Sequence, residues 1–97
     1  MVDLIETKKL LLQRIDNKKA LILSKNLTYK YEETKLLLET DFKAEGLTNE
    51  KLRNAFITKK LFNSKKEIEW LKYDLNVLEN ELSVLNDLIN QGDKNYG

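Results

Sequence analysis

The sequence predicts an all-α protein, a single domain over residues 1–97 built as a hairpin of two long antiparallel helices. Three observations support this fold class. Apolar residues return every three or four positions along most of the chain, the spacing of one helix face. Proline is absent, and the three glycines are confined to the middle and the end, so each half is uninterrupted. The charges of the two halves also become complementary when the chain folds back on itself.

The first helix is expected over about residues 2–40. Its apolar face is formed by Leu4, Leu11, Ile15, Ile22, Tyr29 and Leu36. A second apolar register takes over in the later half, formed by Leu23, Leu27, Tyr31, Thr34 and Leu38. The change of register predicts that the buried face rotates near Lys25 and Asn26, through a stutter or a kink.

The turn is expected over residues 41–48. Gly46 can adopt the left-handed backbone conformation that ends a helix, because it has no side chain to clash. Thr48 is the expected N-cap of the next helix, accepting a hydrogen bond from a free amide of the first turn. Leu47 and Leu52 have the spacing of a hydrophobic staple around that cap.

The second helix is expected over about residues 48–91, followed by a short polar tail at 92–97. Two interleaved heptad lines give it a buried seam: Leu61, Ile68, Leu75, Leu82 and Ile89, and Ile57, Ser64, Leu71, Leu78 and Leu85. Only Ser64 interrupts this seam. Both helices are basic first and acidic later, so an antiparallel hairpin places each basic block beside an acidic one. Exposed ion pairs contribute only about 0–1 kcal/mol each, so the blocks select orientation more than they stabilise.

A further apolar stripe on the second helix lies away from the seam and needs a partner. The candidate partner or dimer interface comprises Phe56, Phe62, Trp70, Tyr73, Val77 and Val84. One interpretation is that a second copy packs there, giving a homodimeric four-helix bundle. The other is that the aromatic residues anchor a different protein.

A basic block is the candidate nucleic-acid patch. It comprises Lys51, Arg53, Lys59, Lys60, Lys65 and Lys66, interleaved with Phe56 and Phe62. Such a block can contact phosphates while aromatic rings stack on bases. The competing interpretation is a solvated face paired with Glu32, Glu33 and Glu39 of the first helix.

Residue types argue against catalysis and cofactors. The chain has no histidine and no cysteine, which removes the usual general base, thiol nucleophiles, disulfides and common zinc ligands. A lone glycine at Gly46 is no phosphate-binding loop. We therefore expect no catalytic, cofactor-binding or metal-binding residues and no small-molecule substrate. No apolar run reaches the roughly 18 residues that span a bilayer, and no signal sequence is apparent, so we expect a cytoplasmic protein without membrane contact.

The segment 41–56 resembles part of a group of small phage and prophage coiled-coil hairpin proteins. Two runs of residues match. The first is Asp41, Phe42 and Lys43, and the second is Gly46, Leu47, Thr48, Asn49, Glu50, Lys51, Leu52, Arg53, Asn54, Ala55 and Phe56. In those proteins a short turn leads into an Asn-Glu-x-x-Arg-x-Ala helix start and a long heptad helix. The resemblance implies a phage-encoded accessory protein in the host cytoplasm, associated with recombination genes or with blunting host defence, and it supplies no catalytic residue.

Together these patterns predict a non-enzymatic coiled-coil homodimer that binds a protein target, as an inhibitor or adaptor. The alternative is a nucleic-acid-binding accessory protein in phage recombination or replication. A purely structural spacer is a third possibility. The identity of the partner is not encoded in a helix face, which carries hydrophobicity and charge without naming what it fits.

Overall fold

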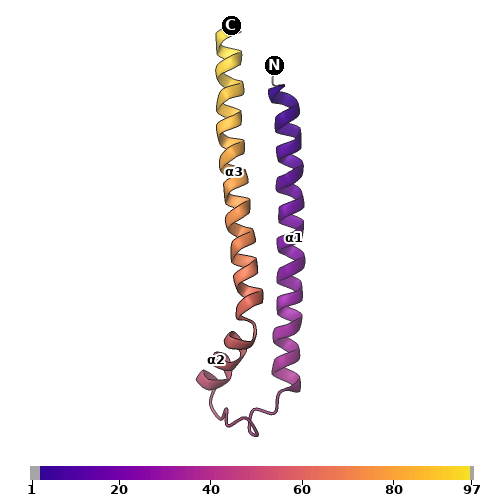
Figure 1. The fold of residues 1–97 in the computed structure, drawn as a ribbon, viewed down its shortest axis with the longest axis vertical. Coiled ribbons are helices and arrows are strands. Elements are labelled where there is room, and N and C mark those ends of the chain that lie inside the picture. The colour runs from indigo at the N-terminus through magenta and orange to yellow at the C-terminus, as the bar shows by residue number, and fades with distance from the viewer. Residues whose placement is uncertain (1–2, 97) are drawn as a thin grey trace. The chain divides into compact units, whose positions relative to one another are not determined.

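The computed structural model describes residues 3–96 of the chain, with side chains through Gly92. Its regular structure is helical throughout the described residues (Figure 1). Helix α1 spans Leu4–Glu39, α2 spans Glu50–Lys60 and α3 spans Phe62–Tyr96. The all-α prediction is confirmed, with two long helices. The expected second helix is divided into α2 and α3.

The chain forms two compact units, and both long helices contribute to each. Unit 1 comprises Met1–Ile22 and Trp70–Gly97, and unit 2 comprises Leu23–Glu69. Unit 1 therefore pairs the first part of α1 with most of α3. Unit 2 contains the rest of α1, the turn, α2 and the start of α3.

Unit 1 has an apolar core between its two helical segments. Leu11, Ile15 and Leu85 are buried at its centre. Half-buried neighbours pack against them: Leu4, Leu75, Leu78, Leu82 and Ile89. Further along α1, the Lys18 ammonium lies 3.9 Å from an Asp74 carboxylate oxygen. A later residue of α1 thus contacts an earlier residue of α3 than Leu11 does. The two segments of unit 1 are antiparallel.

Unit 2 buries the first part of the seam that the sequence predicts for the second helix. Ile57, Leu61 and Ile68 are each no more than 6% exposed. Lys25 forms a 3.1 Å ion pair with Glu67 across the two long helices. The seam residues that the heptad pattern selected are buried or half-buried in both units, and even Ser64 is half-buried.

The expected rotation of the buried face of α1 is wrong. Leu23, Leu27, Tyr31 and Leu38 are 60–81% exposed, whereas the original face, through Ile22, Tyr29 and Leu36, stays at least half-buried. The lysines that interrupt this face do not force a change of register, because Lys18 and Lys25 remain half-buried and reach carboxylates on α3. Long lysine stems cover apolar surface while their charged ends find partners.

The turn confirms one prediction and corrects another. Gly46 has φ 73°, the left-handed conformation expected for it. The N-cap of α2 is Asn49, not Thr48, because the Asn49 side chain accepts a 2.9 Å hydrogen bond from the Leu52 amide. Leu47 then lies two residues before the cap, out of register for the staple, and its carbonyl accepts a 3.2 Å hydrogen bond from Arg53 Nε.

Leu61 separates α2 from α3 without breaking the hydrogen-bonded path. Its backbone has φ −102° and ψ 11°, outside the helical region. The Leu61 amide still bonds to the Ile57 carbonyl at 3.0 Å, and the Leu61 carbonyl accepts from the Lys65 amide at 3.0 Å. The result is a bend at a buried leucine. At the other end α3 continues through Gly92 to Tyr96, beyond the expected stop.

Candidate interaction surfaces

Most of the predicted stripe lies on α3 in unit 1 and is uncovered there. Trp70 and Tyr73 are each 59% exposed, and their rings meet edge to face with centroids 6.0 Å apart. Val84 is 60% exposed and Val77 somewhat less. Exposed aromatic and aliphatic side chains on one helix face are typical of protein interfaces. The core of unit 1 uses the other side of α3, so this stripe contributes little to folding of the single chain.

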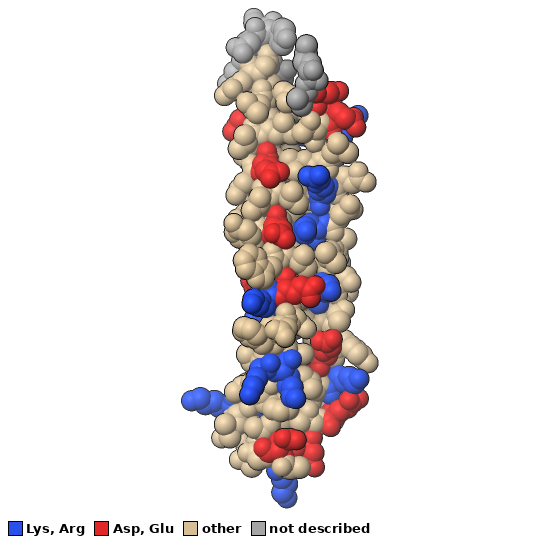
Figure 2. Space-filling model, viewed as in Figure 1, with Lys and Arg blue, Asp and Glu red and all other residues tan. Residues whose placement is uncertain are grey.

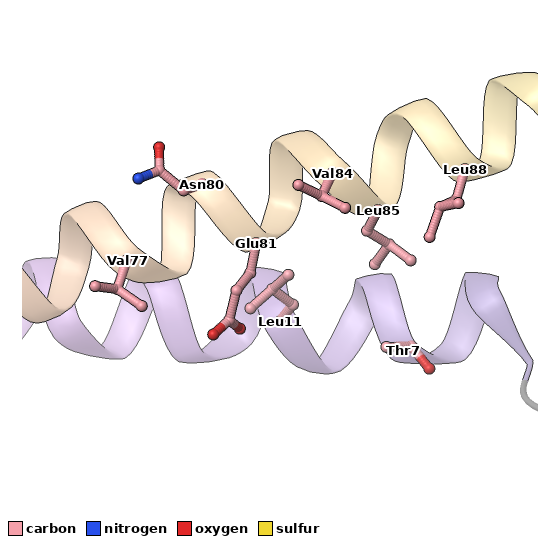
Figure 3. Close-up of a pocket in the computed structure, with 8 residues that line it drawn as sticks. All are labelled: Thr7, Leu11, Val77, Asn80, Glu81, Val84, Leu85 and Leu88. Carbon is pink, nitrogen blue, oxygen red and sulfur yellow. The ribbon is translucent and has the colours of Figure 1, made fainter.

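A shallow apolar groove of about 520 Å³ lies along the same stripe (Figure 3). Its α3 wall includes Val77, Val84 and Leu88, and Thr7 and Leu11 of α1 form the other side. Glu81, between the two valines, extends its carboxylate toward α1 in Figure 3. The full lining is Thr7, Leu11, Val77, Asn80, Glu81, Val84, Leu85 and Leu88. The groove therefore combines an apolar floor with one acidic group.

A second groove on unit 1 adds a basic group. Arg14 and Leu21 of α1 line it, together with Leu78 of α3. Neither Arg14 nor Glu81 makes an ion pair within the part of the chain whose side chains are described. In Figure 2, acidic side chains lie over the unit 1 part of α3, and basic side chains lie beside them over α1. Unit 1 therefore presents both signs of charge beside apolar grooves.

Sequence reasoning missed a second uncovered surface, on α1 in unit 2. The α1 stripe, as we call it, consists of Leu23, Leu27, Tyr31 and Leu38, which are 60–81% exposed. These residues recur at spacings of four and seven, so they share one side of the helix. The sequence contains their pattern, but the pattern by itself predicts a buried face. Only the structure separates an apolar face that the chain covers from one that it leaves open.

The aromatic residues near the turn of unit 2 serve a local role. Phe42 and Phe56 meet edge to face with centroids 6.4 Å apart. Arg53 lies 5.6 Å above the Phe42 ring and Lys60 lies 5.5 Å from the Phe56 ring centre. Cation–π contacts of this kind contribute about 0.5–1 kcal/mol at exposed sites. Phe56 is thus occupied within its own unit, whereas Phe62 is exposed.

The predicted basic patch lies entirely within unit 2. All six of its cationic side chains are exposed. Arg53 and Lys60 are engaged by the two rings, and Lys60 also borders a groove with Glu32 and Glu39. None of the six has an ion-pair partner among the described side chains, and four of them also lack a ring contact: Lys51, Lys59, Lys65 and Lys66. Two cations of the patch therefore contact rings of their own unit, and the other four are open to solvent.

The described residues show no metal cluster, membrane-spanning helix or unsatisfied buried polar atom. Among the described side chains, no group of three or more His, Cys, Asp or Glu residues could hold a metal ion. No helix within residues 3–96 is long and apolar enough to cross a membrane. The described side chains, those of residues 3–92, contain no buried nitrogen or oxygen that lacks a hydrogen-bond partner.

Comparison of the chain with models of protein families, with curated proteins and with solved structures gives no match.

Proposed function

We propose that this chain is a non-enzymatic, homodimeric coiled-coil protein that acts by binding another protein. The observation that carries the proposal is the α1 stripe of unit 2. A large aromatic and three leucines are exposed on one side of a helix whose opposite side, at Tyr29 and Leu36, is half-buried. A helical stripe with such spacing suits insertion into an apolar groove of a partner.

The resemblance at 41–56 gives the proposal its biological setting. The chain is a phage-encoded inhibitor or adaptor, acting in the host cytoplasm on a larger host or phage protein such as a component of a defence system. The residues of the resemblance act structurally here. Asn49 caps α2, and Arg53 holds the turn through the Leu47 carbonyl and the Phe42 ring.

Affinity capture from a host lysate tests this function. The tagged full chain is compared with the double variant Leu27→Asn/Tyr31→Asn and with a control, Lys30→Asn, at an exposed position of the same stretch of α1. Each capture is run with and without nuclease. We expect a defined protein band that survives nuclease, persists with the control and is lost with the double variant, while circular dichroism shows unchanged helix content.

Two results would contradict protein binding through the α1 stripe. One is a band of equal strength with the double variant and the wild type. The other is the absence of any nuclease-resistant band, which is the result that a structural spacer predicts.

Nucleic-acid binding is the second candidate, favoured by the six exposed basic side chains at 51–66, none of which has an ion-pair partner among the described side chains. Phosphate contacts would make its affinity fall steeply with added salt. The charge reversals Lys59→Glu and Lys60→Glu together should weaken binding to single- and double-stranded DNA at least tenfold. Fluorescence anisotropy with labelled DNA measures this, and affinity that is unchanged by the reversals removes the candidate.

A further inference from the structure

We propose that the apolar groove on unit 1 is occupied by α1 of a second copy of this chain, with Arg14 of each copy paired to Glu81 of the other. This inference rests on the homodimer of the proposed function and specifies its surface, orientation and register. It involves residues of unit 1 only.

The interface is one side of unit 1 to which both helices contribute. Thr7 lines the groove, and Leu10, Arg14 and Leu21 follow it at intervals of three, seven and fourteen residues, so they lie on the same side of α1. Leu10 is 54% and Leu21 40% exposed. On α3, the corresponding side carries Val77, Val84 and Leu88. A face with apolar residues on both of its helices can pack against its own copy, as a two-fold interface requires.

Charge selects the orientation of the second copy. Within unit 1, the α1 segment carries a basic excess from Lys8, Lys9, Arg14, Lys18 and Lys19 over Asp3, Glu6 and Asp16. Through Gly92, the α3 segment carries an acidic excess from Asp74, Glu79, Glu81 and Asp87 over Lys72. A two-fold axis perpendicular to the helices would place like helix against like helix. An axis parallel to the helices places each α1 against the partner's α3, so that opposite charges meet.

The same axis fixes the register. Rotation about an axis parallel to the helices leaves each residue at its original height along them. Within the chain, Leu11 packs at the level of Leu85 and Lys18 lies opposite Asp74, so Arg14 stands at the level of Glu81. In the dimer, Arg14 of each copy therefore faces Glu81 of the other. Neither residue has an ion-pair partner among the described side chains of a single chain.

A mixing experiment with two full-length charge-reversal variants tests the arrangement. Arg14→Glu alone and Glu81→Arg alone each bring like charges together in their own homodimer. We expect each to weaken self-association at least tenfold by analytical ultracentrifugation. When the two variants are mixed, both interchain contacts become attractive again, so the heterodimer should recover wild-type affinity within about threefold. Native mass spectrometry of variants with tags of different mass identifies it.

Mixing also separates contacts between chains from contacts within one chain. Pairing of residues 14 and 81 inside a chain stays repulsive in each variant, so it would give no recovery on mixing, and that result would overturn the inference. Self-association that is unchanged by either reversal would also overturn the inference, although the chain would still be a dimer. A wild-type chain that stays monomeric at high concentration would instead reject the homodimer of the proposed function.

Discussion

Gly46 and Gly92 are the same residue type, but we expect their substitution by alanine to change stability in opposite directions. Gly46 has φ 73° and open space around the position of an added Cβ, so its cost is purely that of the backbone. Gly92 lies within α3 and is equally unobstructed. Gly46→Ala should lower the free energy of unfolding by about 1–2 kcal/mol. Gly92→Ala should raise it by up to about 1 kcal/mol, because alanine favours the helix.

Urea unfolding followed by far-UV circular dichroism, at one fixed protein concentration, measures both glycine variants. Equal effects of the two substitutions would contradict the assignment of Gly46 to the turn and Gly92 to the helix.

Asn49 is the residue on which the start of α2 depends. Its side chain satisfies the Leu52 amide, which has no partner inside the helix. Asn49→Ala should therefore cost about 1 kcal/mol of stability. Thr48→Ala is the matched control and should change stability by less than about 0.5 kcal/mol. Thermal and urea unfolding report both, and a larger loss at Thr48 would restore the cap predicted from the sequence.

At the scale of single residues, sequence patterns identified Gly46 but not the cap. Glycine near the centre of a proline-free chain leaves little choice for a left-handed turn residue. Thr48 and Asn49 are adjacent and both good N-caps, so local chemistry does not separate them. The path of the turn decides between them, because the Leu47 carbonyl is held by Arg53 and the helix starts at Glu50.

At the scale of the helices, the seam of the second helix contains one polar residue, Ser64. Ser64 is half-buried beside a cavity of about 110 Å³ that Tyr29 and Ile68 also line. Ser64→Leu should fill part of it and raise the free energy of unfolding by about 1 kcal/mol. Ser83→Leu, at an exposed position of α3, controls for the higher helix propensity of leucine. Equal gains for the two variants in urea unfolding would show that Ser64 does not lie in a packed seam.

Heptad spacing predicted which side of α3 is buried, because its two interleaved apolar lines form one face that needs a partner helix. It did not predict the break at Leu61. Neither proline nor glycine occurs nearby, and the amide and carbonyl of Leu61 both keep helical hydrogen bonds. On α1 the pattern failed for another reason. Leu27 and Tyr31 follow a helical period as well as any core residue, and spacing alone does not reveal whether a chain has a second helix to cover them.

For the molecule as a whole, the candidate interface predicted from sequence divides between the two units. Trp70, Tyr73, Val77 and Val84 lie together on α3 in unit 1, whereas Phe56 is held near the turn of unit 2 by Phe42 and Lys60. Composition could exclude chemistry that needs histidine or cysteine. Composition could not show which exposed apolar residues contact a second copy and which contact a target, because both partners are bound by the same kinds of side chain.

The mass of the full chain in solution tests the account most directly. Size exclusion with light scattering, run across a range of concentrations, should give twice the chain mass of 11.4 kDa. Trp70→Ala removes an exposed ring of the unit 1 surface and should shift the average mass toward that of the monomer. A wild-type mass of 11.4 kDa at the highest concentration would contradict the account.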